Sequence, residues 1–216
     1  MAVWNGFPLI TLPAMPPAPR SVEWQFTDVM GVNENPFSLQ QQFYQWGQAI
    51  IEISFMYPPV PTNPALSATR GSPPAWQAFL AALQGNYGVF LSPADPLHES
   101  PQNASATSPT VSGVNASGVT TINVSGGTST NQTVGDWIGV PGNGASFSTG
   151  SRIYLVTAVG SGTLGIYPPL REATVGGEVI VINGAQGVWR LKSPTRKFSV
   201  DTQRTFGFSL EAREAL

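Results

Sequence analysis

The clearest hydrophobic pattern in the chain is helical and lies between Ser72 and Gly85, in the sequence SPPAWQAFLAALQG. Four large apolar residues recur there at spacings of three and four, which places them on one face of a helix. Ser72 is a favourable N-cap, Pro73 suits the first helical position, and Gly85 can adopt the left-handed conformation that ends a helix. The pattern therefore predicts one helix over residues 73–84, whose apolar face must pack across a β-sheet.

Alternation of apolar and polar residues predicts β-strands on both sides of this helix. A further strand is expected at residues 38–46, followed by a turn at Gly47, whereas residues 31–37 (GVNENPF) have the composition of a link. The clearest alternating runs are residues 21–27 (SVEWQFT), 48–57 (QAIIEISFMY) and 205–212 (TFGFSLEA). The residues expected in the structural core are Trp24, Phe26, Ile51, Ile53, Trp76, Phe79, Leu80, Leu83, Phe206 and Phe208.

The composition changes sharply in the middle of the chain. Between residues 100 and 150 the only charged residue is Asp136, and Ser, Thr, Asn and Gly dominate. Short strand patterns then follow one another, each bounded by Gly or Pro: TTINV, DWIGV, SRIYLVTAV, TLGIY and EVIVI. We predict a mainly β protein in which residues 1–97 and 186–216 form a discontinuous domain. Residues 98–185 would form a small β-barrel or sandwich inserted into it.

Charge adds a limit on the partners of this protein. Charged residues make up 10% of the chain and the formal net charge is −2, which disfavours general nucleic-acid binding. The N-terminus lacks the pattern of a signal peptide, and no apolar stretch has the length of a membrane span, so we expect a soluble protein without a targeting segment. Six of the ten Lys and Arg residues follow Gly187. Those expected to make subunit contacts are Arg190, Lys192, Arg196, Lys197 and Arg204.

The sequence offers no catalytic constellation. His98 is the only histidine and there is no cysteine, so a His-rich or thiolate metal site cannot form within one chain. No Gly-x-Ser-x-Gly motif accompanies His98, no pattern pairs two carboxylates, and no phosphate-binding glycine loop precedes the helix. We expect no enzymatic activity, no cofactor and no metal.

Three aromatic residues in the insert, Trp137, Tyr154 and Tyr167, allow two interpretations. Aromatic rings on a β surface can stack on sugars, as in carbohydrate-binding modules. The favoured interpretation is that they fill the core of a small barrel that has few other large side chains.

Several phrases together resemble the distal tail proteins of long-tailed bacteriophages and their relatives in prophages and gene-transfer agents. In chain order these phrases are RSVEWQF, NPFSLQQQFYQWG, IIEISFMYPP, AWQAFLAALQGNYGVFL, LGIYPPLR, GVWRLKS and FGFSLEAREAL. They cover most of the chain, and the match is poorest at residues 100–150. The resemblance implies a β-sandwich or split barrel with one flanking helix, related to tail-tube proteins and assembled as a six-fold ring in the virion tail tip after synthesis in the host cytoplasm.

The implied partners are further copies of the chain, the tail tube protein, the hub or baseplate proteins, and a tape-measure protein in the lumen. Strands 38–57 and 196–212 would form the ring wall, the N-terminal arm and the loop 58–71 would reach neighbours, and the insert would project outward. Low charge and proline-fixed loops suit such protein-covered surfaces. The alternatives are another tail-tube or minor tail protein, and a carbohydrate-binding accessory module that contacts host surface glycan through the insert.

Overall fold

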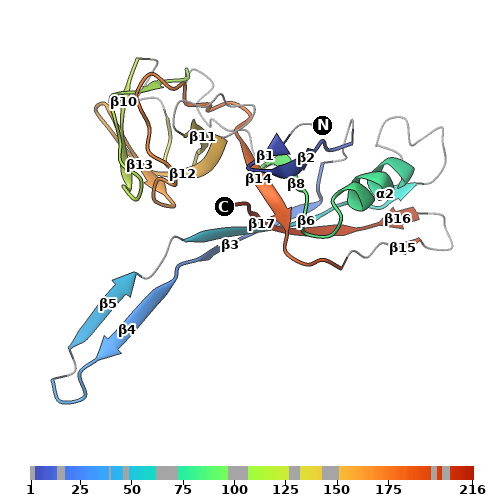
Figure 1. The fold of residues 1–216 in the computed structure, drawn as a ribbon, viewed down its shortest axis with the longest axis horizontal. Coiled ribbons are helices and arrows are strands. Elements are labelled where there is room, and N and C mark those ends of the chain that lie inside the picture. The colour runs from blue at the N-terminus through green and yellow to red at the C-terminus, as the bar shows by residue number, and fades with distance from the viewer. Residues whose placement is uncertain are drawn as a thin grey trace.

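The protein is a mainly β molecule with one described helix, which confirms the predicted fold class. The computed structural model describes residues 3–13, 18–38, 40–45, 49–61, 73–96, 107–126, 132–142, 151–195, 199–200 and 205–216. Figure 1 shows a main body, a smaller β body at one end of it, and a thin two-stranded arm that projects from the main body. The elements are β1 (Val3–Trp4), β2 (Phe7–Ile10), β3 (Ser21–Thr27), β4 (Met30–Glu34), β5 (Gln41–Gln45), β6 (Ile50–Met56), β7 (Val60–Pro61), α2 (Pro73–Ala82), β8 (Val89–Pro93), β9 (Thr110–Val111), β10 (Thr121–Ser125), β11 (Trp137–Pro141), β12 (Ser151–Gly160), β13 (Thr163–Tyr167), β14 (Gln186–Leu191), β15 (Ser199–Val200), β16 (Thr205–Gly207) and β17 (Ser209–Glu214).

The main body is built on a seven-stranded sheet with the strand order β1-β2-β8-β14-β17-β6-β3. Every neighbouring pair is antiparallel except β2 and β8, which are parallel. These strands come from the beginning and the end of the chain, and a small sheet of β15, β16 and β7 lies beside them. The insert has its own sheet and shares no strand with the seven-stranded one.

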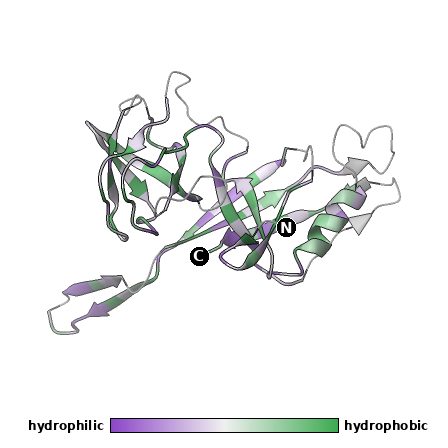
Figure 2. Cartoon of the chain, turned by 45° about the horizontal axis from the view of Figure 1, so that its top comes forward, coloured by the Kyte–Doolittle hydropathy of each residue, from purple (hydrophilic) through white to green (hydrophobic). Residues whose placement is uncertain are grey.

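The helix α2 packs on this sheet through the apolar face that the sequence predicts. Its four expected core residues are all buried, and the Trp76 ring lies 5.0 Å from the Tyr57 ring and 4.4 Å from the Phe208 ring, measured between centroids. Gly85, just beyond the helix, has a φ of +76°, as a helix-ending glycine requires. Ser72, the expected N-cap, lies outside the described residues. Figure 2 shows the hydrophobic colouring of α2 and of the strands behind it.

The other expected core residues divide into three groups. Ile51, Ile53, Phe206 and Phe208 are buried in the same cluster as α2. Trp24 is half-buried against that cluster, and its indole Nε1 donates to the carbonyl of Ala94 at 2.9 Å. Phe26 is 42% exposed, so its assignment to the core is wrong. Its ring lies at the margin of the core, where it contacts Trp137 and Tyr167 of the insert and keeps one side in water.

The insert is a closed barrel of small size. Its sheet has the order β11-β12-β13-β10-β9, and residues 177–181 bond to both edge strands. Val179 is bridged to Thr110 of β9, and Val181 is bridged to Gly139 of β11. The segment EVIVI thus closes the barrel through bridges instead of forming the expected regular strand, and a separate apolar cluster fills the interior.

The arm is the outer part of one long β-ribbon. β3 pairs with β6 inside the main body, and two residues after β3 the chain continues as β4, which pairs with β5. The link expected at residues 31–37 is therefore wrong for 31–34, which belong to β4, whereas 35–37 lie in the turn at the tip. The ribbon reverses between Asn35 and Gln40, whose backbone N–H and carbonyl are bonded at 2.9 Å. Gly47, the expected turn, lies outside the described residues.

The N-terminal segment also departs from expectation, since its described residues do not form an extended arm. β1 and β2 make a hairpin, and β2 joins the seven-stranded sheet beside β8. Asn5 and Gly6 at its turn both have positive φ, of 44° and 82°, which is typical of a type I′ turn. Trp4 is only 3% exposed, so this segment packs on its own chain.

Candidate assembly surfaces and the junction with the insert

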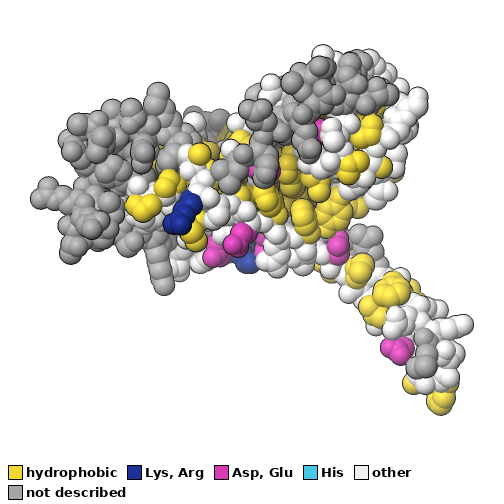
Figure 3. All heavy atoms as spheres, turned by 180° about the vertical axis from the view of Figure 1, so that it is seen from behind, with side chains coloured by type: hydrophobic (Ala, Val, Ile, Leu, Met, Phe, Trp, Pro, Cys, Tyr) yellow, Lys and Arg dark blue, Asp and Glu magenta, His cyan; other side chains and the backbone are white. Residues whose placement is uncertain are grey.

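The arm exposes apolar side chains along one of its faces. The register pairs Val32 with Phe43, so the two share a face, and Met30 lies on that same face two residues before Val32. Met30, Val32 and Phe43 are 57%, 58% and 63% exposed, and Phe37 at the tip is 97% exposed. Figure 3 shows these hydrophobic side chains spaced along the projecting arm. Soluble monomers rarely expose a contiguous apolar face to water, so this face is a candidate contact surface.

Polar contacts nevertheless give the arm a defined local structure. At the tip, the Asn35 side-chain oxygen accepts from the backbone N–H of Phe37 at 2.9 Å, which forms an Asx turn. Further along, the Gln41 amide donates to Glu34 at 3.3 Å and the Tyr44 hydroxyl donates to Gln42 at 2.6 Å. A lone two-stranded ribbon is only marginally stable in water, so a covering surface would stabilise it.

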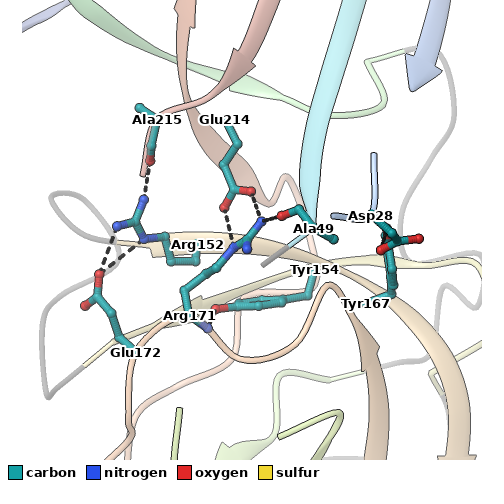
Figure 4. Close-up of polar contacts among 9 residues, drawn as sticks. All are labelled: Asp28, Ala49, Arg152, Tyr154, Tyr167, Arg171, Glu172, Glu214 and Ala215. Atoms are coloured by element: carbon teal, nitrogen blue, oxygen red, sulfur yellow. Dashed lines mark hydrogen bonds and ion pairs between the residues drawn. The ribbon is translucent and has the colours of Figure 1, made fainter. Parts of the chain in front are cut away.

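The base of the arm is held on both strands by the insert (Figure 4). The hydroxyl of Tyr167 donates to the Asp28 carboxylate at 2.9 Å, between β3 and β4. The Arg171 guanidinium donates to the carbonyl of Ala49, between β5 and β6. The insert therefore bonds to both chain segments at the level where the ribbon leaves the sheet.

Arg171 is at the same time half of a buried ion pair. Its Nη2 lies 2.5 Å from one carboxylate oxygen of Glu214 on β17, and both side chains are 2% exposed. Its Nε donates to the other oxygen at 3.3 Å, so the contact is bidentate. Burial raises the pKa of the Glu214 carboxyl, and the hydrogen bond from Arg171 opposes that rise. The Arg171 backbone N–H also donates to the hydroxyl of Tyr154 at 3.0 Å, which ties the pair to the barrel core.

A second arginine of the insert, Arg152 on β12, makes a parallel connection. Its guanidinium donates to the carbonyl of Ala215 and pairs with Glu172 at 3.0 Å, and it lies 4.8 Å from the centre of the Trp4 ring. Packing accompanies these polar contacts, because Ile153 of the insert belongs to the main-body core. At Gly187 on β14, an added Cβ would lie 3.0 Å from a side-chain methyl of Ile153, which is tighter than ordinary contact and shows how closely the two bodies approach there.

The three aromatic residues singled out in the insert, all of them described, do not form an exposed sugar platform. Trp137 and Tyr154 are 6% and 1% exposed, and burial raises the pKa of Tyr154. Trp137 stacks on Phe26 at a centroid distance of 6.4 Å, and Tyr167 meets Phe26 edge-on at 5.3 Å. Tyr154 fills the barrel core, whereas Trp137 fills the core of the main body. These rings join the two bodies.

The expected basic contact residues are only partly described. Lys192 is exposed and its Nζ lies 2.7 Å from Glu52, a contact that raises the pKa of the lysine. Arg190 is half-buried, with its guanidinium carbon 4.2 Å from the centre of the Phe7 ring. Arg196, Lys197 and Arg204 lie outside the described residues.

The remaining candidates for chemistry stay separate. His98 and Glu99 lie outside the described residues, and within those described no group of three His, Cys, Asp or Glu residues could hold a metal ion. In the described part of the chain, no helix has the length and apolar character needed to cross a membrane.

Comparison with known proteins adds no relative. No protein-family model matches the chain, and no curated protein matches its sequence.

Sequence reasoning missed Arg152, Arg171, Glu172 and Glu214 as residues of the junction. A weak signal was present, because a charged residue in so uncharged a chain is more often held by a specific partner. The partners themselves are 43 residues apart for Arg171 and Glu214 and could not be matched without the topology.

Proposed function

We propose that this chain is a structural protein of a bacteriophage tail tip, a ring-forming distal tail protein that joins the tail tube to the baseplate or tip complex. The observation that carries the proposal is the projecting arm, which holds a bare apolar face away from its own body. Covering this apolar face with protein would remove it from water and so stabilise the assembly. Because every copy carries the same arm, each copy can place its arm on one neighbour and bind the arm of another.

Repetition of that contact produces a ring when the rotation between copies closes. This head-to-tail arrangement suits a tail protein, which works by geometry and has no reaction to perform. The insert supports the distal tail assignment over that of a plain tube subunit, because a barrel bonded at the base of the arm adds a second rigid body to each position of the ring. Further copies of the chain are the first expected partners, and tube, hub or baseplate and tape-measure proteins follow from the ring.

The test is the oligomeric state of the full chain by light scattering after size exclusion, together with negative-stain microscopy. We expect six-fold rings. Replacing Phe37 and Phe43 with serine should abolish the rings and leave the thermal unfolding of the subunit unchanged, because both side chains lie in water in the single chain.

The matched control replaces Val114 and Val134 with serine, two residues of the insert that are 74% and 57% exposed. Rings should persist in that variant. A wild-type chain that stays monomeric at high concentration, even with the tail tube protein added, would contradict the proposal. Rings that survive loss of both phenylalanines would contradict the role of the arm.

A further inference from the structure

Arg190 on β14 is half-buried, and part of its guanidinium group is buried without a hydrogen-bond partner among the described residues. It lies on the sheet face opposite the core residues Trp189 and Leu191, beneath the Phe7 ring. Its Nε and Nη2 atoms are buried and have no acceptor within the described part of the chain. Buried guanidinium groups are almost always paired, so this one calls for an acceptor that the described residues do not supply.

A second arginine stands next to it. Arg213 of β17 is the register partner of Arg190, which puts two positive side chains on one face of adjacent strands. Like charges in directly opposite positions are unfavourable unless an anion lies between them. No ion pair joins either arginine to another described residue. The two carboxylates nearest in register or sequence are engaged elsewhere, Glu52 by Lys192 at 2.7 Å and Glu214 by Arg171 at 2.5 Å.

A cavity of about 200 Å³ lies at the two arginines. It is lined by Ile50, Arg190, Arg213, Glu214, Ala215 and Leu216. Two guanidinium groups supply donors in planar forks. The carboxylate of Glu214 also lines the cavity but is engaged by Arg171, and the remaining lining is apolar, which suits the methylene groups of an acidic side chain.

We infer that this cavity is a carboxylate-binding site, and that its natural ligand is an aspartate or glutamate side chain of a partner protein. A nucleic-acid phosphate backbone is disfavoured, because Glu211 and Glu52 lie on the same sheet face beside Arg213 and would repel an extended polyanion. The inference stands apart from the proposed ring, since a single chain can bind a carboxylate without assembling.

The test is a titration of the full-length chain, labelled with ¹⁵N-arginine, with sodium acetate replacing sodium chloride at constant ionic strength. The Nε–H signals of Arg190 and Arg213 should shift and saturate. Arg190→Gln and Arg213→Gln should each weaken the acetate affinity by about tenfold or more. Arg213 is exposed, so its variant keeps the test valid if loss of Arg190 disturbs folding.

Arg20→Gln is the control, because it removes one positive charge from an exposed residue that does not line the cavity. It should leave the affinity for acetate unchanged. A short peptide containing one glutamate, with blocked ends, should bind more tightly than acetate if the ligand is a protein side chain.

Three results would overturn the inference. They are shifts that never saturate, equal affinity in Arg213→Gln and the wild type, and tighter binding of inorganic phosphate than of acetate. Equal or weaker binding of the peptide than of acetate would remove the protein side chain as the source.

Discussion

The inner and outer halves of the long β-ribbon each carry apolar side chains on one face, and these faces lie in opposite environments. In the inner half, β3 and β6 place Ile51, Ile53 and Phe55 against α2 and the rest of the core, all at 2% exposure or less. In the outer half, β4 and β5 place Met30, Val32 and Phe43 in water. Alternation of apolar and polar residues therefore predicts a strand with one apolar face, but it does not say which molecule covers that face.

The junction between the two halves explains how one ribbon can be part of the core at one end and project into water at the other. Asp28 and Ala49 mark the level at which the ribbon leaves the sheet, and the insert bonds to both through Tyr167 and Arg171. A free ribbon would bend at this level, where regular pairing is interrupted between β3 and β4. The bonds from the insert fix the direction in which the arm points.

The sharpest test of the comparison is the same substitution in each half. Phe55→Ala should lower the free energy of unfolding by about 3 to 5 kcal/mol, because it leaves a cavity at a residue that is 1% exposed. Phe43→Ala should change it by less than about 0.5 kcal/mol, because that ring is 63% exposed in the single chain. Urea unfolding of both variants at a concentration where the protein is monomeric measures the difference. Similar losses in the two variants would break the distinction between the halves.

The next effect concerns the buried pair that holds the junction. Glu214→Gln should lower the free energy of unfolding by about 3 kcal/mol, because Arg171 keeps its charge in a site where its counter-ion is gone. Amide exchange near Ala49 should also become faster. In the double variant Arg171→Met with Glu214→Leu, most of the stability should return, since no unpaired charge is left buried. If Glu214→Gln alone were as stable as the wild type, the ion pair between Arg171 and Glu214 would not be formed in solution.

A smaller loss is expected at the aromatic contact between β3 and the insert. Phe26→Ala should cost about 1 kcal/mol, since the ring is half in water and its remaining contacts are with Trp137 and Tyr167. Thermal unfolding measures this, with Phe37→Ala at the tip as the neutral comparison. A loss of stability as large as that of Phe55→Ala would show that Phe26 belongs to the core.

The smallest effect is expected at Tyr167, and it depends on pH in the alkaline range. Burial and the hydrogen bond to Asp28 raise the pKa of Tyr167 to about 12, from an unfolded value of about 10. A raised pKa means that the stabilisation is fully present below pH 10 and is lost as the pH rises through 12. Tyr167→Phe should lose about 0.5 kcal/mol at neutral pH. Because the wild type loses stability above pH 10 and the variant has no phenol to ionise, the difference should shrink and then reverse in sign toward pH 12. A constant difference up to pH 12 would argue against the bond to Asp28.

The sequence predicted those parts of the fold that depend on near neighbours. The α2 stripe, the strand at 21–27 and the alternation around Ile53 are set by local periodicity, and the structure has them at those residues. The hairpin β1–β2 was missed although Asn5-Gly6 between apolar residues is a strong hairpin signal. The proline content of the first twenty residues obscured it.

Other features could not be read from the sequence because they depend on distant pairing. The strand expected at residues 38–46 is present as β5, but GVNENPF is a weak strand former. The pairing of β4, which includes residues 31–34 of that segment, with β5 follows from the ribbon that β3 and β6 begin. The site at Arg190 and Arg213 was visible only as part of a basic tail. Its placement required the register between β14 and β17, which brings the two residues opposite each other.

The attachment of the insert has a mechanical consequence. The chain leaves the main sheet after Pro93 and re-enters it at Gln186, and these two residues are register partners at one end of the β8–β14 pair. A force pulling the insert away would load that pair from its end, so its hydrogen bonds would break one at a time. The bonds of Arg171 to Ala49 and of Arg152 to Ala215 bypass this weak point, because they carry the load directly to β6 and β17. These two arginines would be the first residues to resist such a force.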